Sequence, residues 1–138
     1  GGSVPVGKYT RQALMNLGIL DKADDASTIT TEQISEALGG AEISEQANVS
    51  KVLIAVTEGA CEVGTTYYSD IYGYEDQIKI LQTVSYDLTG NVIYPICRVE
   101  NKEADDAKKK AADDFLAYVT SDDAKKIFDS YYFDTIVE

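Results

Sequence analysis

The feature that most constrains this fold is a series of helix patterns with defined ends, separated by segments typical of β-strands. Residues 5–17 begin with Pro5, which suits a first helical turn because its missing N–H needs no partner there, and they stop before Gly18. Asn48 is a good N-cap for a second amphipathic pattern over residues 49–56. We therefore expect several short, capped helices.

Three more helices are predicted from similar signals. Thr30 and Gln33 have the spacing of a capping box, for a short helix that ends at the glycine pair 39–40. Residues 103–120 favour one longer helix, and Ser121 is a suitable N-cap for a last short one. The apolar residues of the longer helix that we expect to face inward are Ala111, Phe115, Leu116 and Val119.

Three segments have the composition of β-strands, namely residues 61–68, 78–84 and 92–99. The first follows the helix pattern over residues 49–56 almost directly, and a helix followed closely by a strand indicates a layered arrangement. Pro95 places part of the third segment at a sheet edge, a bulge or a crossing point. The expected fold class is therefore α/β.

Charge and composition exclude several classes of function. The 138 residues carry 12 basic and 24 acidic side chains, a net charge of −12, which disfavours nucleic acid and anionic membrane surfaces as partners. No apolar run in the sequence approaches the roughly 20 residues of a membrane helix. The sequence contains no His, so it lacks imidazole bases, His metal ligands and Ser-His or Cys-His nucleophile pairs. An enzyme is not expected.

The two cysteines leave two interpretations open. Cys61 and Cys97 each lie in an apolar segment, which favours buried small hydrophobic residues. The alternative is a disulfide, because the two predicted strands could be neighbours. Two cysteines alone do not make a structural zinc site, which takes four ligands. No metal site and no cofactor is therefore predicted.

Several segments occur in an order that one known family also has. They are Val4-Pro5-Val6-Gly7-Lys8-Tyr9, then Asn48-Val49 at a helix start, then Val63-Gly64-Thr65-Thr66-Tyr67 before Tyr68-Ser69-Asp70, and then Tyr94-Pro95-Ile96. In this order they resemble the molybdate- or tungstate-binding protein of ABC importers, a type 2 periplasmic solute-binding protein. The resemblance extends over nearly the whole chain and implies that the chain is the C-terminal portion of such a protein.

The resemblance implies one lobe of a two-lobed, type 2 periplasmic-binding-protein fold with C-terminal helices. Residues 1–95 would form part of the second, ligand-binding lobe of the clamshell. Residues 96–138 would supply a C-terminal strand and helices that return toward the first lobe. A lobe without its partner would expose apolar surface, so self-association of the chain is also expected.

The resemblance further implies three contacts to a tetrahedral oxyanion: the backbone N–H of Val6, the backbone N–H of Val49 and the hydroxyl of Tyr67. Helix starts suit this role, because their first N–H groups have no intrahelical acceptor and lie at the positive end of the helix dipole. All three contacts are hydrogen bonds, so the molybdenum or tungsten atom would have no direct protein ligand. Lys8 and Arg11 could attract an anion, but on a helix we expect them to be solvated.

The implied function is an extracytoplasmic receptor, either periplasmic or a cell-surface lipoprotein. It would bind molybdate or tungstate and deliver it to an ABC permease in the membrane, with no catalytic residue and no cofactor. One alternative is the same fold binding sulfate or a small organic anion. The other is the sensor domain of a transcription regulator, which a DNA-binding helix-turn-helix elsewhere in the gene would indicate.

Overall fold

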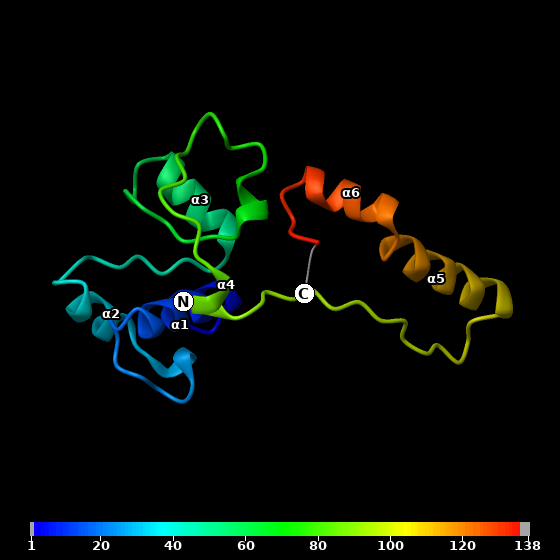
Figure 1. The fold of residues 1–138 in the computed structure, drawn as a ribbon, viewed down its shortest axis with the longest axis horizontal. Helices are drawn as coiled ribbons and strands as arrows, with labels where there is room; N and C mark the ends of the chain where they lie inside the picture. The colour runs from blue at the N-terminus through cyan, green and yellow to red at the C-terminus, as the bar shows by residue number, and fades with distance from the viewer. Residues whose placement is uncertain (1, 136–138) are drawn as a thin grey trace. The chain divides into compact units, whose positions relative to one another are not determined.

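A computed structural model describes residues 2–135, and none of these residues is in a β-strand. Residues up to Val92 form one compact unit, and residues from Ile93 form a second (Figure 1). The first unit contains α1 (Pro5–Asn16), the 3-10 helix η1 (Ala26–Thr28), α2 (Thr31–Ala37), α3 (Val49–Thr57), the 3-10 helix η2 (Tyr68–Ile71) and α4 (Tyr86–Thr89). The second contains α5 (Asp106–Val119) and α6 (Asp122–Ser130).

The predicted helices are confirmed, but the one expected over residues 103–120 begins only at Asp106, and α4 is not among the predicted helices. Pro5 lies in the first turn of α1, and Gly18 follows the helix with a left-handed φ of 74°. At the start of α2 the Thr30 hydroxyl accepts from the Gln33 N–H at 3.3 Å, while the Gln33 side-chain oxygen accepts from the Thr30 N–H at 2.8 Å. The side chains that cap α3, α5 and α6 are Asn48, Asp105 and Ser121. Local hydrogen bonds therefore set where these helices begin.

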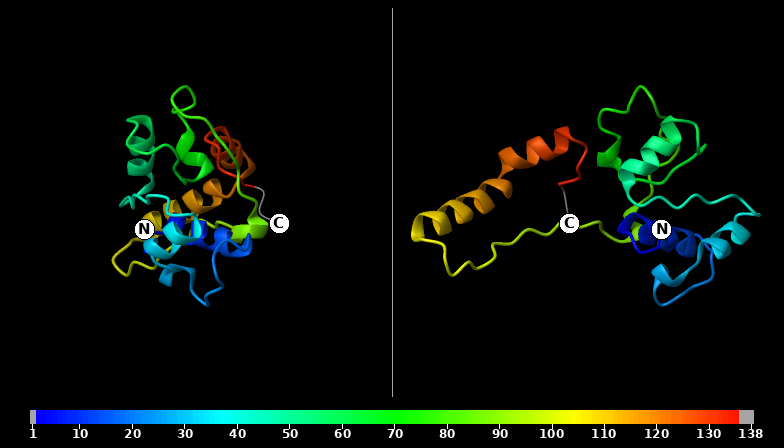
Figure 2. Two further views of the ribbon diagram at one scale, coloured as in Figure 1. Left: turned by 90° about the vertical axis from the view of Figure 1, so that its left-hand side faces the viewer. Right: turned by 180° about the vertical axis from the view of Figure 1, so that it is seen from behind.

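The core of the first unit lies where η1 and α2 meet α1. Its buried members are Met15, Leu20, Ala26, Ile29 and Ile34. The chain after α1 looks like a polar loop in the sequence, yet it turns back so that η1 packs against α1 (Figure 2). The Met15 sulfur accepts a hydrogen bond from the Ala23 N–H at 3.3 Å in this region. The loop is therefore an integral part of the core.

The expectation that Arg11 is solvated is wrong, because only 5% of this residue is exposed. Its Nε donates to the Ile29 carbonyl at 2.8 Å, and its Nη1 donates to the Gly7 carbonyl at 3.1 Å. Its Nη2 pairs with Glu45 Oε1 at 3.1 Å, an oxygen that also accepts from the Thr31 hydroxyl at 2.6 Å. A buried charge is tolerated only when it is bonded in this way. One guanidinium therefore ties α1 to the end of η1 and to the loop before α3.

The segments predicted to be strands, residues 61–68, 78–84 and 92–99, are not paired as strands within the described part of the chain. A strand is held by backbone hydrogen bonds to a neighbouring strand, whereas the sequence pattern reports only how well the side chains suit a sheet. Several apolar side chains of these segments are 60–80% exposed, namely Val63, Leu81, Ile93 and Val99. The helices are confirmed, and the α/β class stays a prediction.

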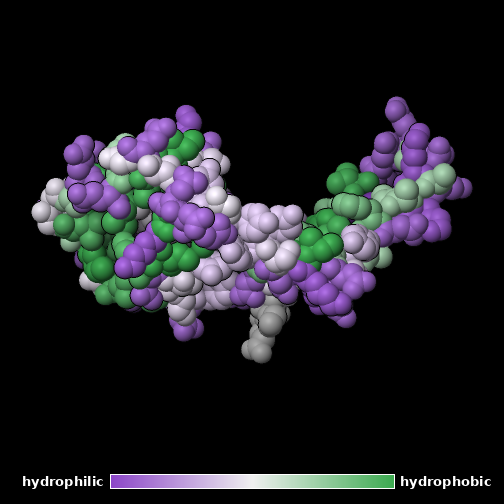
Figure 3. Space-filling model, turned by 90° about the horizontal axis from the view of Figure 1, so that it is seen from above, coloured by the Kyte–Doolittle hydropathy of each residue, from purple (hydrophilic) through white to green (hydrophobic). Residues whose placement is uncertain are grey.

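In the second unit α5 and α6 pack against each other, but α5 does not bury all the side chains predicted to face inward. Leu116 and Val119 are half-buried, whereas Ala111 is exposed and Phe115 is 62% exposed. Two neighbouring helices can cover only the stripe that lies between them. Hydrophobic side chains accordingly appear at the surface, as the space-filling view shows (Figure 3).

The cysteines follow neither interpretation completely. Cys61 is half-buried and Cys97 is exposed, and both are free thiols. Cys97 is thus not the buried hydrophobic residue that its apolar neighbours suggest, because the segment around it has no covering layer among the described residues.

Replacing Arg11 by Met should lower the free energy of unfolding by about 2–4 kcal/mol, because two carbonyls and the Glu45 carboxylate lose their buried donor. Lys8→Met is the matched control, since the Lys8 side chain is 56% exposed on the same helix. Its effect should be about 0.5 kcal/mol or less. Urea unfolding followed by circular dichroism measures both. Equal losses in the two variants would show that Arg11 does not hold these elements together.

Stability should also fall on the acid side because of Glu45. The Thr31 hydroxyl, and then the Arg11 guanidinium, hold the pKa of this carboxyl below its ordinary value of 4.5. The carboxylate therefore stabilises the fold above the unfolded pKa, and this contribution is lost as the pH falls through the lower folded pKa. Glu45→Gln keeps an acceptor oxygen but does not titrate.

Between about pH 5 and about pH 3, the free energy of unfolding of Glu45→Gln should fall less than that of the unmodified chain. Urea unfolding at each pH measures the difference. Glu42→Gln, at an exposed position, is the control and should follow the unmodified chain. An equally steep fall in Glu45→Gln would remove this carboxylate from the acid response.

Candidate ligand-binding site

The start of α1 has backbone donors without helical partners. Val4 precedes the helix and provides no side-chain cap, and Pro5 has no N–H. The next N–H groups, those of Val6 and Gly7, are too early in the helix to have an intrahelical acceptor, and they lie at the positive end of its dipole. Val6, one of the predicted site residues, is half-buried here. This helix start therefore has the properties that anion binding requires.

Val49, the second predicted site residue, is the first residue of α3 and is half-buried. The Asn48 side chain accepts from the Lys51 N–H at 3.0 Å, so the cap engages only one donor of the first turn. The N–H groups of Val49 and Ser50 precede it and have no intrahelical acceptor. The start of α3 therefore resembles that of α1, because it also has backbone N–H groups without an intrahelical acceptor at the positive end of a helix dipole.

Tyr67, the third predicted site residue, immediately precedes η2 and is held there by Asp70. The Tyr67 N–H donates to Asp70 Oδ2 at 3.2 Å, and the Asp70 N–H donates back to the Tyr67 carbonyl at 3.1 Å. The Thr66 hydroxyl donates to the same carboxylate oxygen at 2.7 Å. Sequence reasoning did not single out Asp70. The available signal was an acid three residues after a turn start, which is the spacing of a side-chain cap.

Side-chain contacts join Tyr67 to α1. The rings of Tyr9 and Tyr67 meet edge to face, with centroids 6.5 Å apart and an angle of 73° between the planes. One residue further along α1, the Thr10 hydroxyl donates to the Thr65 hydroxyl at 3.1 Å. The structure therefore brings the segment that ends in Tyr67 against α1, the helix that carries Val6 in its first turn.

The same segment also lies against α3. A Cβ added to Gly64 would be 2.6 Å from Val52 Cγ1 and 3.0 Å from Val56 Cγ2, so the close approach depends on the missing side chain. α3 also packs against η2. Val49 and Tyr67 thus belong to neighbouring elements, and that their donors face one ligand together with Val6 stays a prediction.

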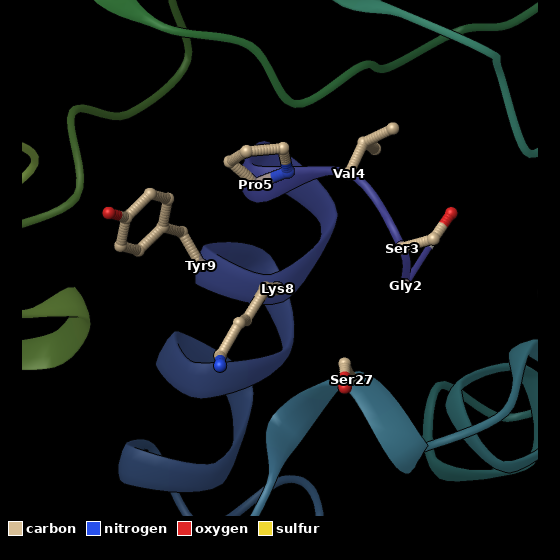
Figure 4. A pocket seen from close by; sticks show the side chains of 7 residues that line it. All are labelled: Gly2, Ser3, Val4, Pro5, Lys8, Tyr9 and Ser27. Atoms are coloured by element: carbon tan, nitrogen blue, oxygen red, sulfur yellow. The ribbon is translucent and has the colours of Figure 1, made fainter.

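A cavity of about 430 Å³ lies beside the start of α1 (Figure 4). Its lining residues come from the chain before α1, from α1 and from η1: Gly2, Ser3, Val4, Pro5, Lys8, Tyr9 and Ser27. Lys8 is exposed, as expected, and its Nζ pairs with Asp25 Oδ1 at 3.4 Å. The Ser27 backbone N–H and hydroxyl, together with Lys8, lower the pKa of Asp25. The ammonium of Lys8 beside this cavity is therefore paired with the carboxylate of Asp25.

The chemistry of the candidate site is that of neutral donors. Among the described residues, no group of three or more His, Cys, Asp or Glu side chains could hold a metal ion. The same part of the chain has no helix of the length and hydrophobicity needed to span a membrane. Backbone N–H groups and a phenol hydroxyl can donate hydrogen bonds to the oxygens of an anion.

Comparison with known proteins gives one family. A family model described as bacterial extracellular solute-binding protein matches residues 1–134. The putative ABC transporter substrate-binding lipoprotein YvgL of Bacillus subtilis (strain 168) is 28% identical over 131 residues, 95% of this chain and 42% of that protein. The molybdate-binding protein ModA of Haemophilus influenzae is 27% identical over 130 residues, 94% of this chain and 42% of ModA. No solved structure matches the chain significantly.

The two curated relatives and the family model each match nearly the whole of this chain. The chain spans 42% of the length of each relative. The family match includes all but the last four residues of the chain. The chain therefore belongs to the family of bacterial extracellular solute-binding proteins.

Proposed function

We propose that this chain is part of an extracytoplasmic receptor that binds molybdate or tungstate and delivers it to an ABC permease in the membrane. The observation that carries the proposal is the family match over residues 1–134. The family points to binding and transport, with no reaction catalysed. The ligand is supported by the likeness to the molybdate-binding protein of Haemophilus influenzae. An extracytoplasmic location is supported by the description of the family, and attachment as a lipoprotein by the name of the Bacillus relative.

In this proposal the oxyanion accepts hydrogen bonds from the backbone N–H groups of Val6 and Val49 and from the Tyr67 hydroxyl. A fully deprotonated oxyanion only accepts, so a site made only of donors favours it over a protonated phosphate, which would leave one donor unpaired. The chain carries a net charge of −12. Long-range attraction therefore cannot bring the anion in, and the site depends on local dipoles.

The proposed fold is one lobe of a two-lobed, type 2 α/β architecture. Residues 1–95 form part of the second lobe, and residues 96–138 supply a strand and helices that return toward the first. The segments 61–68, 78–84 and 92–99 become strands when the rest of the protein provides their partners. The exposure of Val99, which reaches 80%, supports this reading because such a side chain is suited to a covered sheet.

Isothermal titration of the complete gene product with molybdate, tungstate, sulfate and phosphate tests the function. We expect molybdate or tungstate to bind most tightly, and phosphate to bind weakly because its proton opposes a donor. A preference for sulfate would correct the ligand, and failure of all four anions to bind would contradict the proposal.

The isolated chain of residues 1–138 is the comparison in the same titration. It should bind about a hundredfold more weakly or worse, because an anion that lacks half of its donors stays largely hydrated. Tight, stoichiometric binding to the isolated chain would show that the rest of the protein is not required.

Tyr67→Phe in the complete gene product should weaken molybdate binding about tenfold to a hundredfold, because one hydrogen bond to a charged group is lost. Its melting temperature without ligand should be nearly unchanged. Tyr68→Phe is the matched control, since the next tyrosine is 50% exposed and has no proposed role in the site. If Tyr67→Phe binds as tightly as Tyr68→Phe, Tyr67 is not a ligand-binding residue.

A further inference from the structure

We propose that Asp70 is a positioning residue that directs the Tyr67 hydroxyl toward the oxyanion, an inference that rests on the proposed function. Asp70 itself does not touch the ligand. It acts by holding the two backbone groups of Tyr67, the N–H and the carbonyl, on either side of the Tyr67 Cα. Its role follows from the hydrogen bonds around one carboxylate oxygen.

The carboxylate closes a small ring of hydrogen bonds with its neighbours. Oδ2 accepts from the Thr66 hydroxyl at 2.7 Å and from the Tyr67 N–H at 3.2 Å, while the Asp70 N–H donates to the Tyr67 carbonyl at 3.1 Å. All three residues are half-buried, so water competes with these bonds less than at an open surface. Both polar groups of the Tyr67 backbone are thereby held by a single residue.

The aromatic ring of Tyr67 is fixed separately. It meets the Tyr9 ring edge to face, with centroids 6.5 Å apart. A tyrosine hydroxyl is connected to the backbone through only two rotatable bonds. When Asp70 holds the backbone and Tyr9 limits the ring, the direction of the hydroxyl is largely determined. A side chain that contacts a ligand binds it well only when neighbouring residues hold that side chain in one orientation.

The proposed role of Asp70 depends on its acceptor oxygen and not on its negative charge. A carboxylate near an anion repels it, so the charge alone works against binding. As a hydrogen-bond acceptor, however, an ionised carboxylate is stronger than a neutral group. The positioning role needs an oxygen that accepts from the Thr66 hydroxyl and the Tyr67 N–H, as Asp70 Oδ2 does. An asparagine at position 70 would supply such an oxygen without the charge.

Molybdate titration of Asp70 variants in the complete gene product tests this role. Asp70→Ala should weaken binding about tenfold, a moderate loss because the Tyr67 hydroxyl is retained. Asp70→Asn should bind within about twofold of the unmodified protein, because its side-chain oxygen accepts the same two bonds. A loss in Asp70→Asn equal to that in Asp70→Ala would overturn the proposal.

A control variant separates positioning from general stability. Asp105 caps α5 by accepting from the Lys108 N–H at 2.8 Å, so Asp105→Ala removes a comparable bond far along the chain. It should lower the melting temperature without ligand but leave the molybdate affinity unchanged. If Asp70→Ala does not fold, Thr66→Val removes one donor to Oδ2 and should cost about threefold in affinity. An unchanged affinity in a folded Thr66→Val would then contradict the role of this ring.

A double-mutant cycle with Tyr67→Phe identifies the residue through which Asp70 acts. Once the Tyr67 hydroxyl is absent, Asp70→Ala should cause little further loss of affinity, so the two losses should not add. Additive losses would overturn the role of Asp70 alone and leave the receptor function in place. An unchanged affinity in Tyr67→Phe would overturn the assignment of Tyr67 and this role of Asp70 together. Absence of any oxyanion binding by the unmodified protein would overturn the proposed function itself.

Discussion

The first unit depends on one buried guanidinium. Arg11 extends from α1 to the carbonyl of Ile29 and to the carboxylate of Glu45, and it is 5% exposed. These bonds bring the loop after α1 back onto the helix and align it over the apolar core. Because α1 also carries Val6 and contacts Tyr67 through Tyr9, the helix that Arg11 ties to the core is the one that carries part of the candidate site.

The candidate site is made of dipoles rather than charges. Two helix starts supply backbone N–H groups, and a tyrosine at a 3-10 helix start supplies a hydroxyl. Dipoles of this kind bind an anion only when they are held in place, since each is weaker than an ammonium or a guanidinium. The contacts that hold Tyr67 in place therefore matter as much as the donors themselves. In this proposal an acid such as Asp70 can lie beside an anion site because it holds a donor and does not touch the ligand.

The exposure of several apolar side chains agrees with the fact that the chain spans less than half of the length of its curated relatives. The chain spans 42% of each curated relative, and several apolar side chains in the segments with strand composition are 60–80% exposed. Side chains of this type are normally covered. The proposed two-lobed fold would cover them by strand pairing and by the returning helices.

The sequence by itself determined where α1, α2, α3 and α6 begin, because a cap such as Thr30 with Gln33, or a stop such as Gly18, involves groups within four residues of each other. It also indicated Val6, Val49 and Tyr67, through their places in a recognisable order. Only the tertiary structure decided that Arg11 is buried, that Gly64 lies against Val52, and that Asp70 holds Tyr67. Burial and strand pairing depend on which segments far apart in the sequence come into contact, and a local sequence pattern does not specify those contacts.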